Sequence, residues 1–215
     1  MEKRSAAREL AYLALFQLPK NPEKLAKTDF HAICLSAIRT LSDYSKNNVK
    51  QADAFFIQVE RKLMEYHINH EVNEGLDEAS RGAPLPTTKE FFEELNKCYQ
   101  GAALIRESLN VPELYWHYND QQTQDFVFAL VQNFVDKQEE VSNLLRDTSK
   151  SWDPNRMLKM DRIIIELACS EILGTDTPPK VIASEAIKLA NKYSTEEGVK
   201  FVNGIIGDII ATVSH

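Results

Sequence analysis

The sequence predicts an all-α protein. Of its 215 residues, only 7 are glycine and 8 are proline, which leaves little turn-forming chemistry for a sheet of many strands. Apolar residues recur at spacings of three and four along most of the chain, the period of an amphipathic helix. No segment alternates apolar and polar residues with comparable strength, and there is no internal repeat. We therefore expect helices separated by stretches that contain proline or glycine.

Four helices are expected in the first half of the chain, over residues 5–18, 29–45, 49–74 and 89–109. Pro19 and Pro22 end the first helix, because proline cannot continue the helical hydrogen-bond pattern. Residues 75–88 contain Gly82, Pro84 and Pro86 and are expected to form a loop. The side chains expected to face the core are Ala6, Leu10, Leu13, Ala14, Ile33, Ala37, Ile38, Leu41, Ala52, Phe56, Val59, Leu63 and Tyr66.

A second cluster of amphipathic helices is expected after residue 120. One runs over residues 120–145, the next opens at Asp153-Pro154 and ends at Gly174, and a third follows Pro178-Pro179. A capping box, Ser194-Thr195-Glu196-Glu197, begins the last helix. The side chains expected to face the core are Phe126, Leu130, Phe134, Val141, Ile164, Leu167, Ala168, Ile172, Ile182, Ala186, Leu189, Ala190, Val202, Ile206, Ile209, Ile210 and Val213.

The composition indicates a soluble globular protein with reduced thiols. There is no apolar run long enough to span a bilayer, and the first residues lack the apolar stretch of a secretory signal. The three cysteines are scattered without paired spacing, which favours a cytosolic location over a disulfide framework. The formal net charge of -7 comes from residues 21–149, with thirteen basic and twenty-one acidic side chains. Both ends of the chain therefore remain able to meet an anion.

The sequence carries no signature of an enzyme. It lacks a phosphate-binding loop, a dinucleotide fingerprint, a nucleophile elbow and a zinc-protease pair, so we expect no catalytic residue and no cofactor. The strongest metal candidate is His67 with His70 or Glu71 and Glu74, which would share one helical face. We favour an exposed polar face there, because ion sites usually draw ligands from several elements. Cys169 lies beside an apolar stripe and is best interpreted as a buried packing residue.

Two clusters contain residues that are unfavourable within a helix. Arg4 and Arg8 lie four residues apart near Lys3, so their like charges repel unless an anion lies there. A phosphate backbone is one such anion; a solvated helix end is the alternative interpretation. The second cluster is the run from Glu197 to Gly204, whose glycines weaken a helix by ~1 kcal/mol each. Gly204 and Gly207 could allow close helix packing, or Lys200 and Phe201 could offer charge and a stacking face to single-stranded RNA.

The same segments resemble the NusB family of antitermination factors. The run Lys200-Phe201-Val202-Asn203-Gly204, preceded by Glu185-Ala186-Ile187-Lys188-Leu189-Ala190 and by Asp161-Arg162-Ile163-Ile164, is similar to the carboxy-terminal signature of that family. Residues 4–11 with Ala14-Leu15-Phe16 resemble its first helix. The resemblance covers residues 3–18 and about 120–213. It implies a helical bundle of two sub-bundles in a single domain over residues 1–215, with 120–215 as the core and 19–119 as an expanded helical segment.

The resemblance also implies partners and site residues. The family acts without catalysis, together with the small-subunit ribosomal protein NusE, on boxA RNA of nascent ribosomal transcripts in the RNA polymerase antitermination complex. Carried over by position, the RNA-binding residues are Lys3, Arg4, Arg8, Phe16, Glu197, Lys200 and Phe201. A bacterial cytoplasm or a plastid stroma is the expected location. Glu166 stands where the family commonly has arginine, which could alter a partner contact.

Three other functions compete with this expectation. The first is the NusB-like RNA-binding domain of ribosomal RNA methyltransferases, which needs a downstream catalytic domain that is not expected after His215. The second is a helical protein–protein adaptor that has lost RNA binding, favoured by the acidic middle segment and Glu166. The third is a metal-dependent hydrolase that uses His67 and His70.

Overall fold

The computed structural model describes residues 2–18, 29–73, 88–148, 153 and 157–213, and every regular element within them is a helix. The predicted all-α class is confirmed. The chain divides into two compact units. Unit 1 comprises Met1–Ile38 and Leu114–His215, and unit 2 comprises Arg39–Glu113. None of the described helices combines the length and the low charge that a membrane-spanning segment needs.

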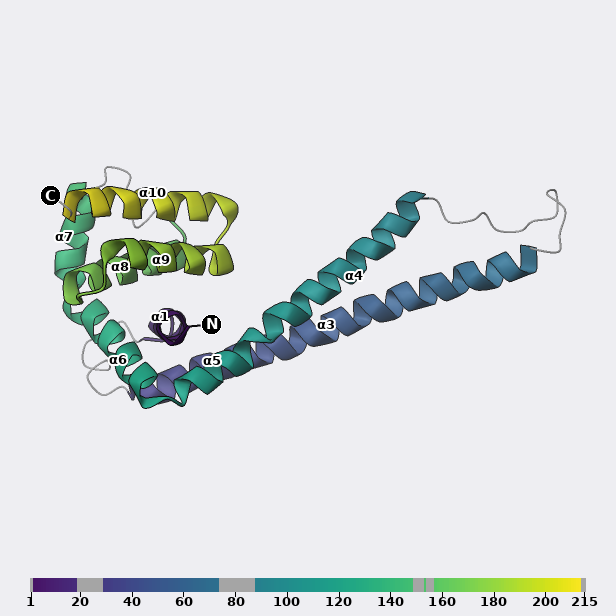
Figure 1. The fold of residues 1–215 in the computed structure, drawn as a ribbon, viewed down its shortest axis with the longest axis horizontal. Coiled ribbons are helices and arrows are strands. Elements are labelled where there is room, and N and C mark those ends of the chain that lie inside the picture. Colours follow the sequence, from purple (N-terminus) through teal and green to yellow (C-terminus); the bar gives the residue numbers. More distant parts are fainter. Residues whose placement is uncertain (1, 19–28, 74–87, 149–152, 154–156, 214–215) are drawn as a thin grey trace. The chain divides into compact units, whose positions relative to one another are not determined.

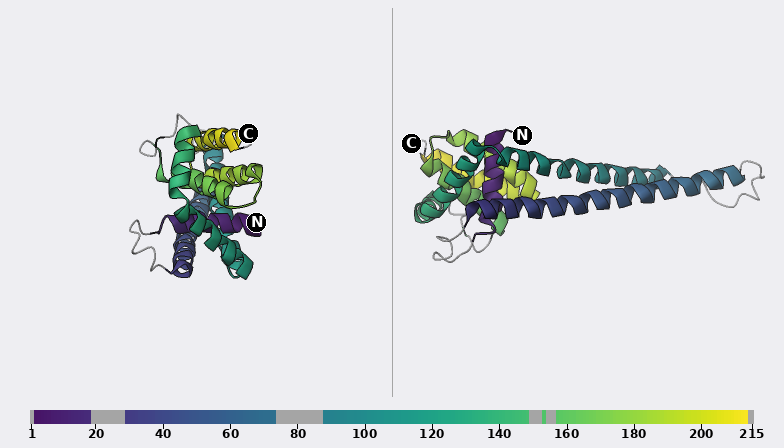
Figure 2. Two further views of the ribbon diagram at one scale, coloured as in Figure 1. Left: turned by 90° about the vertical axis from the view of Figure 1, so that its left-hand side faces the viewer. Right: turned by 90° about the horizontal axis from the view of Figure 1, so that it is seen from below.

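Unit 1 contains most of the helices. They are α1 (Lys3–Leu15), the start of α3 (Phe30–Asn73), the end of α5 (Asn110–Tyr118), α6 (Gln121–Asp136), α7 (Gln138–Thr148), α8 (Lys159–Gly174), α9 (Pro179–Tyr193) and α10 (Glu196–Val213). Helices α8, α9 and α10 pack against one another, and α1 packs against α6 (Figures 1 and 2). Contacts of α8 with both α1 and α6 join the two groups into one core.

Helix α1 is the most deeply buried of these elements. Ala6, Ala7, Ala11 and Ala14 are fully inaccessible to solvent, and small side chains let neighbouring helices approach closely. The adjacent helices bury larger apolar groups against it. The core of unit 1 includes Leu10, Tyr12, Leu130, Leu145, Ile164, Ile165, Ile182, Ile206 and Ile209.

Several helix boundaries differ from the prediction. Helix α3 is continuous from residue 30 to 73, where two helices were expected. The predicted helix 120–145 is divided at Lys137, whose φ and ψ of -102° and 15° leave the helical region. Helix α5 was not predicted; its Pro112 lies in the first turn, where a missing amide hydrogen costs little. The break at Lys137 contains neither proline nor glycine, so the sequence gives no sign of it.

The starts of α8 and α10 are also corrected. Helix α8 begins at Lys159, whereas a start at Asp153-Pro154 was expected. This expectation is wrong for Asp153, which is not helical. Pro154 lies outside the described residues. At α10, the Thr195 hydroxyl accepts a hydrogen bond from the Gly198 amide at 3.1 Å. The expected Ser194–Glu197 capping box is therefore displaced, and the Ser194 hydroxyl donates to Asp161 Oδ1 instead.

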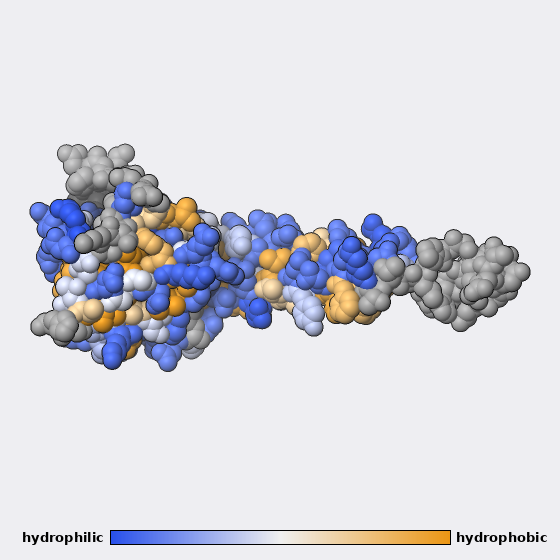
Figure 3. Space-filling view, turned by 90° about the horizontal axis from the view of Figure 1, so that it is seen from above, coloured by the Kyte–Doolittle hydropathy of each residue, from blue (hydrophilic) through white to orange (hydrophobic). Residues whose placement is uncertain are grey.

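Unit 2 is a hairpin of two antiparallel helices, the remainder of α3 and α4 (Thr88–Ser108) (Figure 1). Ala52 and Val59 are buried, and Ser108 Oγ donates to the carbonyl of Ser45 at 3.2 Å. The expected burial of Phe56 and Leu63 is wrong, since they are 37% and 47% exposed. A pair of helices covers only one face of each, so apolar and polar side chains mix on the surface of this unit (Figure 3).

Candidate functional site

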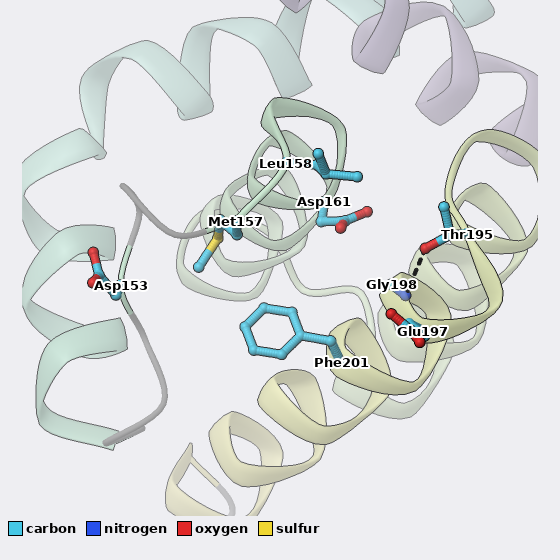
Figure 4. Close-up of a pocket in the computed structure, with 8 residues that line it drawn as sticks. All are labelled: Asp153, Met157, Leu158, Asp161, Thr195, Glu197, Gly198 and Phe201. Carbon is cyan, nitrogen blue, oxygen red and sulfur yellow. Dashed lines mark hydrogen bonds between the residues drawn. The ribbon is translucent and has the colours of Figure 1, made fainter.

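A cleft of about 510 Å³ opens between the start of α8 and the start of α10 (Figure 4). Its walls combine carboxylate, hydroxyl and apolar groups. They are Asp153, Met157, Leu158, Asp161, Thr195, Glu197, Gly198 and Phe201. Glu197 and Phe201 were predicted as site residues from the sequence, and the structure brings both into this cleft. The other six were not predicted, although Asp161 belongs to the run that resembles the NusB signature.

Helix α10 presents three predicted residues along one stretch. The half-buried Phe201 ring projects into the cleft, opposite Met157 (Figure 4). Glu197 lies one turn earlier and is exposed at the rim. Lys200 precedes Phe201 and is exposed, so its ammonium group is accessible. The arrangement offers an aromatic face, a carboxylate acceptor and a cation within one helical turn.

The cleft depends on a close contact between α8 and α10. Asp161 is 4% exposed and accepts a hydrogen bond of 2.5 Å from Ser194 Oγ. A Cβ atom added at Gly198 would lie 2.9 Å from Asp161 Oδ2 and would collide with Ser194 Oγ. Gly198 therefore permits the approach. The expectation that Gly204 and Gly207 allow close packing is wrong, because no described atom lies within 4 Å of a Cβ added at either position.

Phe16 lies beside the same part of unit 1. It is half-buried at the end of α1, and Lys159 Nζ lies 4.9 Å from its ring centroid. Lys159 follows Leu158, which lines the cleft. Tyr12 holds the Phe16 ring edge-on at 5.0 Å. Phe16 thus contacts the cationic Lys159, whose neighbour in sequence, Leu158, is one residue of the cleft wall.

Lys3 and Arg4 lie at the other end of α1, a helix of 13 residues and about 20 Å. Lys3 Nζ donates to Asp120 Oδ1 at 3.0 Å, and this bond lowers the pKa of Asp120, together with the bonds from Thr123. The Arg4 guanidinium lies 5.3 Å from the centroid of the Phe126 ring. Both cations are exposed. The predicted site residues therefore form two groups, one at each end of α1.

Arg8 does not belong to either exposed group. It is 4% exposed, and its guanidinium donates to Glu171 through Nε at 2.9 Å and Nη2 at 2.6 Å. Nη1 lies 3.9 Å from Glu185 Oε2. The anion that offsets the Arg4–Arg8 repulsion is thus a buried carboxylate of the protein itself. Arg8, which was predicted to bind RNA, therefore lies in the core of this structure and presents no exposed charge to a phosphate.

The other chemical candidates of the sequence are Cys169 and the metal-ligand group near residue 70. Burial, together with the charge of Glu166, raises the pKa of the Cys169 thiol to about 12, so the thiol stays protonated at neutral pH. The described part of the chain holds no group of three potential metal ligands. The His67, His70, Glu71 and Glu74 candidate lies outside the side chains that the structure describes.

Glu166 faces a smaller pocket of about 220 Å³, where its Oε1 lies 3.8 Å from Arg162 Nε. Burial raises the pKa of Glu166, and the Arg162 charge only partly opposes this effect. The folded protein therefore favours the neutral form of Glu166 over the charged form. The contribution of Glu166 to the free energy of unfolding is fully present below the ordinary glutamate pKa. It is lost as the pH rises through the raised pKa of Glu166.

We expect Glu166→Gln to stabilise unit 1 at neutral pH and to have little effect at acid pH, because glutamine carries no charge to desolvate. Urea unfolding measured at a series of pH values tests this expectation. Glu139→Gln, at an exposed position on α7, is the matched control and should change the unfolding free energy little at any pH. A Glu166→Gln effect that disappears as the pH rises would contradict the assigned direction.

Comparison with known proteins connects this architecture to one family. The model of the NusB family matches residues 87–211. Among curated proteins, "Transcription antitermination protein NusB" of Cyanothece sp. is 31% identical over 96% of this chain and 93% of its own length. The protein of the same name from Crocosphaera subtropica is 28% identical over 100% of this chain and 97% of its own length. The protein of the same name from Synechococcus elongatus is 30% identical over 96% of this chain and 92% of its own length. The comparison with solved structures gave no match.

Proposed function

The chain belongs to the NusB family, and from this membership we propose that it is a non-catalytic transcription antitermination factor. It binds a boxA-like single strand of nascent ribosomal RNA together with NusE, as part of the RNA polymerase antitermination complex. The relatives carry antitermination in their names, and their similarity extends along nearly the whole chain. The proposed location is the bacterial cytoplasm, or a plastid stroma, where such transcripts are made.

The observation that supports RNA binding most strongly is the cleft beside α10. Single-stranded RNA is bound through stacking of its bases on aromatic side chains and through hydrogen bonds to the exposed base edges. Phe201 supplies the aromatic face, and the Glu197 carboxylate can accept from a base amino or imino group. Lys200 lies beside them, and its exposed ammonium group is accessible to a phosphate. In this proposal one nucleotide stacks in the cleft while the backbone passes Lys200.

The exposed cations of α1 extend the proposal. Phe16 with Lys159 offers a second aromatic and cationic group beside the cleft. Lys3 and Arg4 are exposed at the far end of α1 and are available to a phosphate further along the strand. Lys3 would have to share its charge with Asp120, so its contribution is expected to be smaller. Arg8 is excluded from the proposed RNA face because it is buried and paired.

The test is fluorescence anisotropy of a labelled boxA-like RNA, with and without NusE. Phe201→Leu keeps an apolar side chain but removes the stacking face, so we expect roughly 5-fold to 150-fold weaker binding. Lys200→Gln should lower the slope of log affinity against log salt concentration by about 0.7, the value for one lost contact to a single strand. Lys46→Gln, at an exposed lysine of unit 2, makes the same charge change and should leave the affinity intact.

Three outcomes separate the competing functions. Binding that strengthens with NusE and weakens in Phe201→Leu and Lys200→Gln supports the proposal. Specific binding that neither variant changes would retain the function but exclude the cleft. If no RNA binds even in the presence of NusE, the proposal fails and the helical adaptor becomes the better interpretation. The exposed apolar side chains of unit 2 would then be the first surface to search for a protein partner.

A further inference from the structure

A third pocket lies in unit 1, between the first turns of α3, the end of α5 and α6. Its volume is about 190 Å³, and it shares no lining residue with the cleft beside α10. The residues that matter here are Phe30, His31, Cys34, Tyr118, Asp125 and Phe128. The volume is below the 300–1,000 Å³ typical of small-molecule sites, so the pocket fits a single side chain better than a whole ligand.

Aromatic rings form the walls of this pocket. Phe30 and Phe128 meet edge to face with ring centroids 5.6 Å apart. His31 stacks on Tyr118 at 5.4 Å, and the Tyr118 hydroxyl is hydrogen-bonded to His31 Nδ1 at 2.7 Å. This bond fixes the two rings relative to each other. Phe128 remains 51% exposed although it lines the pocket, so part of an aromatic face is open to a partner.

Cys34 and Tyr118 contribute no negative charge to the pocket. Cys34 is 4% exposed, and burial raises the pKa of its thiol to about 11, with the Tyr118 hydrogen bond opposing and the charge of Asp29 reinforcing the rise. Burial also raises the pKa of the Tyr118 hydroxyl. Both groups therefore stay protonated at neutral pH. The pocket offers neither a thiolate nor a phenolate.

Carboxylates supply the negative charge at this site. Asp125 lines the pocket, is exposed, and accepts from Gln121 Nε2 at 2.9 Å. Asp29 caps the start of α3, where Oδ1 accepts from the His31 amide at 2.9 Å. Among the described residues, neither carboxylate forms an ion pair with a lysine or an arginine. Lys3, which reaches the start of α6, is paired with Asp120.

We propose that this aromatic and acidic pocket binds an arginine side chain from a basic segment of a protein partner. A planar guanidinium stacks on aromatic faces and donates to carboxylates, so the rings and Asp125 are complementary to it in shape and in charge. An RNA strand is a poorer occupant, because its phosphates would approach unpaired carboxylates. The proposal uses residues distant in sequence from α10 and does not rest on RNA binding.

The test is the anisotropy of a fluorescent peptide with arginines spaced by glycine and serine, titrated with the full chain. We expect Asp125→Asn to weaken binding roughly twofold to fivefold, the range expected for loss of an exposed ion pair. The matched control is Asp136→Asn. Asp136 lies on the same helix, is exposed, and accepts from Gln132 at 2.8 Å, as Asp125 does from Gln121. It lines no part of the pocket and should leave binding unchanged.

Two further comparisons distinguish a specific pocket from general attraction to an acidic protein. Phe128→Leu preserves bulk and charge but removes the ring, and it should weaken binding to a similar extent. Substitution of citrulline for arginine in the peptide should abolish binding. Equal weakening by Asp125→Asn and Asp136→Asn would overturn the proposal, as would undiminished binding of the citrulline peptide. A short single-stranded RNA that displaces the peptide from the wild type but not from Phe128→Leu would also overturn the proposal, in favour of a nucleotide site.

Discussion

Replacement of Arg8 by methionine is expected to lower the free energy of unfolding by about 3–5 kcal/mol. Methionine fills similar space but leaves the Glu171 carboxylate, which is 1% exposed, without the guanidinium that binds it at 2.6 and 2.9 Å. Glu185 loses the same neighbour at 3.9 Å. A buried carboxylate that has lost its cation is costly because no water replaces the lost hydrogen bonds. Urea unfolding followed by circular dichroism measures the change.

Controls separate this buried network from ordinary surface charge. Lys3→Met removes an exposed ion pair and should therefore change the free energy of unfolding far less than Arg8→Met. The double variant Arg8→Met/Glu171→Leu removes both charges and should recover much of the stability lost in Arg8→Met. If Arg8→Met were as mild as Lys3→Met, the buried pair would not stabilise the packing of α1 against α8.

The same variant has an expected pH dependence. Burial tends to raise the pKa of Glu185, but hydrogen bonds from Lys188 and Ser5 and the charges of Lys188 and Arg8 outweigh it, so the pKa is lowered. The stability that Glu185 contributes is present above the ordinary glutamate pKa and is lost as the pH falls through the lowered value. Without Arg8, part of the lowering disappears. Acid unfolding of Arg8→Met should therefore begin at a higher pH than that of the wild type.

Gly198→Ala is expected to destabilise the protein by about 1–3 kcal/mol, the usual cost of forcing a methyl group into a packed contact. The new Cβ would meet Ser194 Oγ and the Asp161 carboxylate. Ser194 cannot turn away freely, because its hydroxyl donates to Asp161, which is buried. The substitution would separate α8 from α10 and change the cleft that contains Phe201.

Gly207→Ala in the same helix provides the matched comparison. No described atom lies within 4 Å of a Cβ at this exposed position, so only helix propensity changes and the protein should gain up to about 1 kcal/mol. In urea unfolding, we expect Gly198→Ala to lower the free energy of unfolding and Gly207→Ala to raise it. If Gly198→Ala also stabilised the protein, the assigned contact with Ser194 and Asp161 would be wrong.

Much of the fold was predictable because helix formation is local. Ile182, Ala186, Leu189 and Ala190 were expected on one stripe of α9, and all four are buried. The end of α8 at Gly174 was also expected and is confirmed. The break at Lys137 was not predicted, because no proline or glycine marks it. The continuity of α3 was missed although residues 46–48, between the two expected helices, contain neither proline nor glycine. Packing, rather than propensity, determines where such helices begin and end.

The candidate site was predictable only in part. The run from Glu197 to Phe201 stood out in the sequence, and two of its members line the cleft. Asp161 in α8, with Met157 and Leu158 just before that helix, completes the cleft from about forty residues earlier. No local pattern connects these residues to α10. The aromatic and acidic pocket was missed entirely, since its residues come from three helices and each looks ordinary in its own segment.

The sequence by itself determined the helical class, the apolar faces, the uneven distribution of charge and the likeness to the NusB family. Periodicity and residue type carry this information, because they depend on neighbours within one or two helical turns. Only the tertiary structure decided which charged groups remain available to a ligand. Arg4 and Arg8 look equivalent in sequence, yet Arg8 meets Glu171 across 163 residues and is withdrawn from solvent, while Arg4 stays exposed. The physical reason is that burial and ion pairing depend on contacts between segments that are distant along the chain.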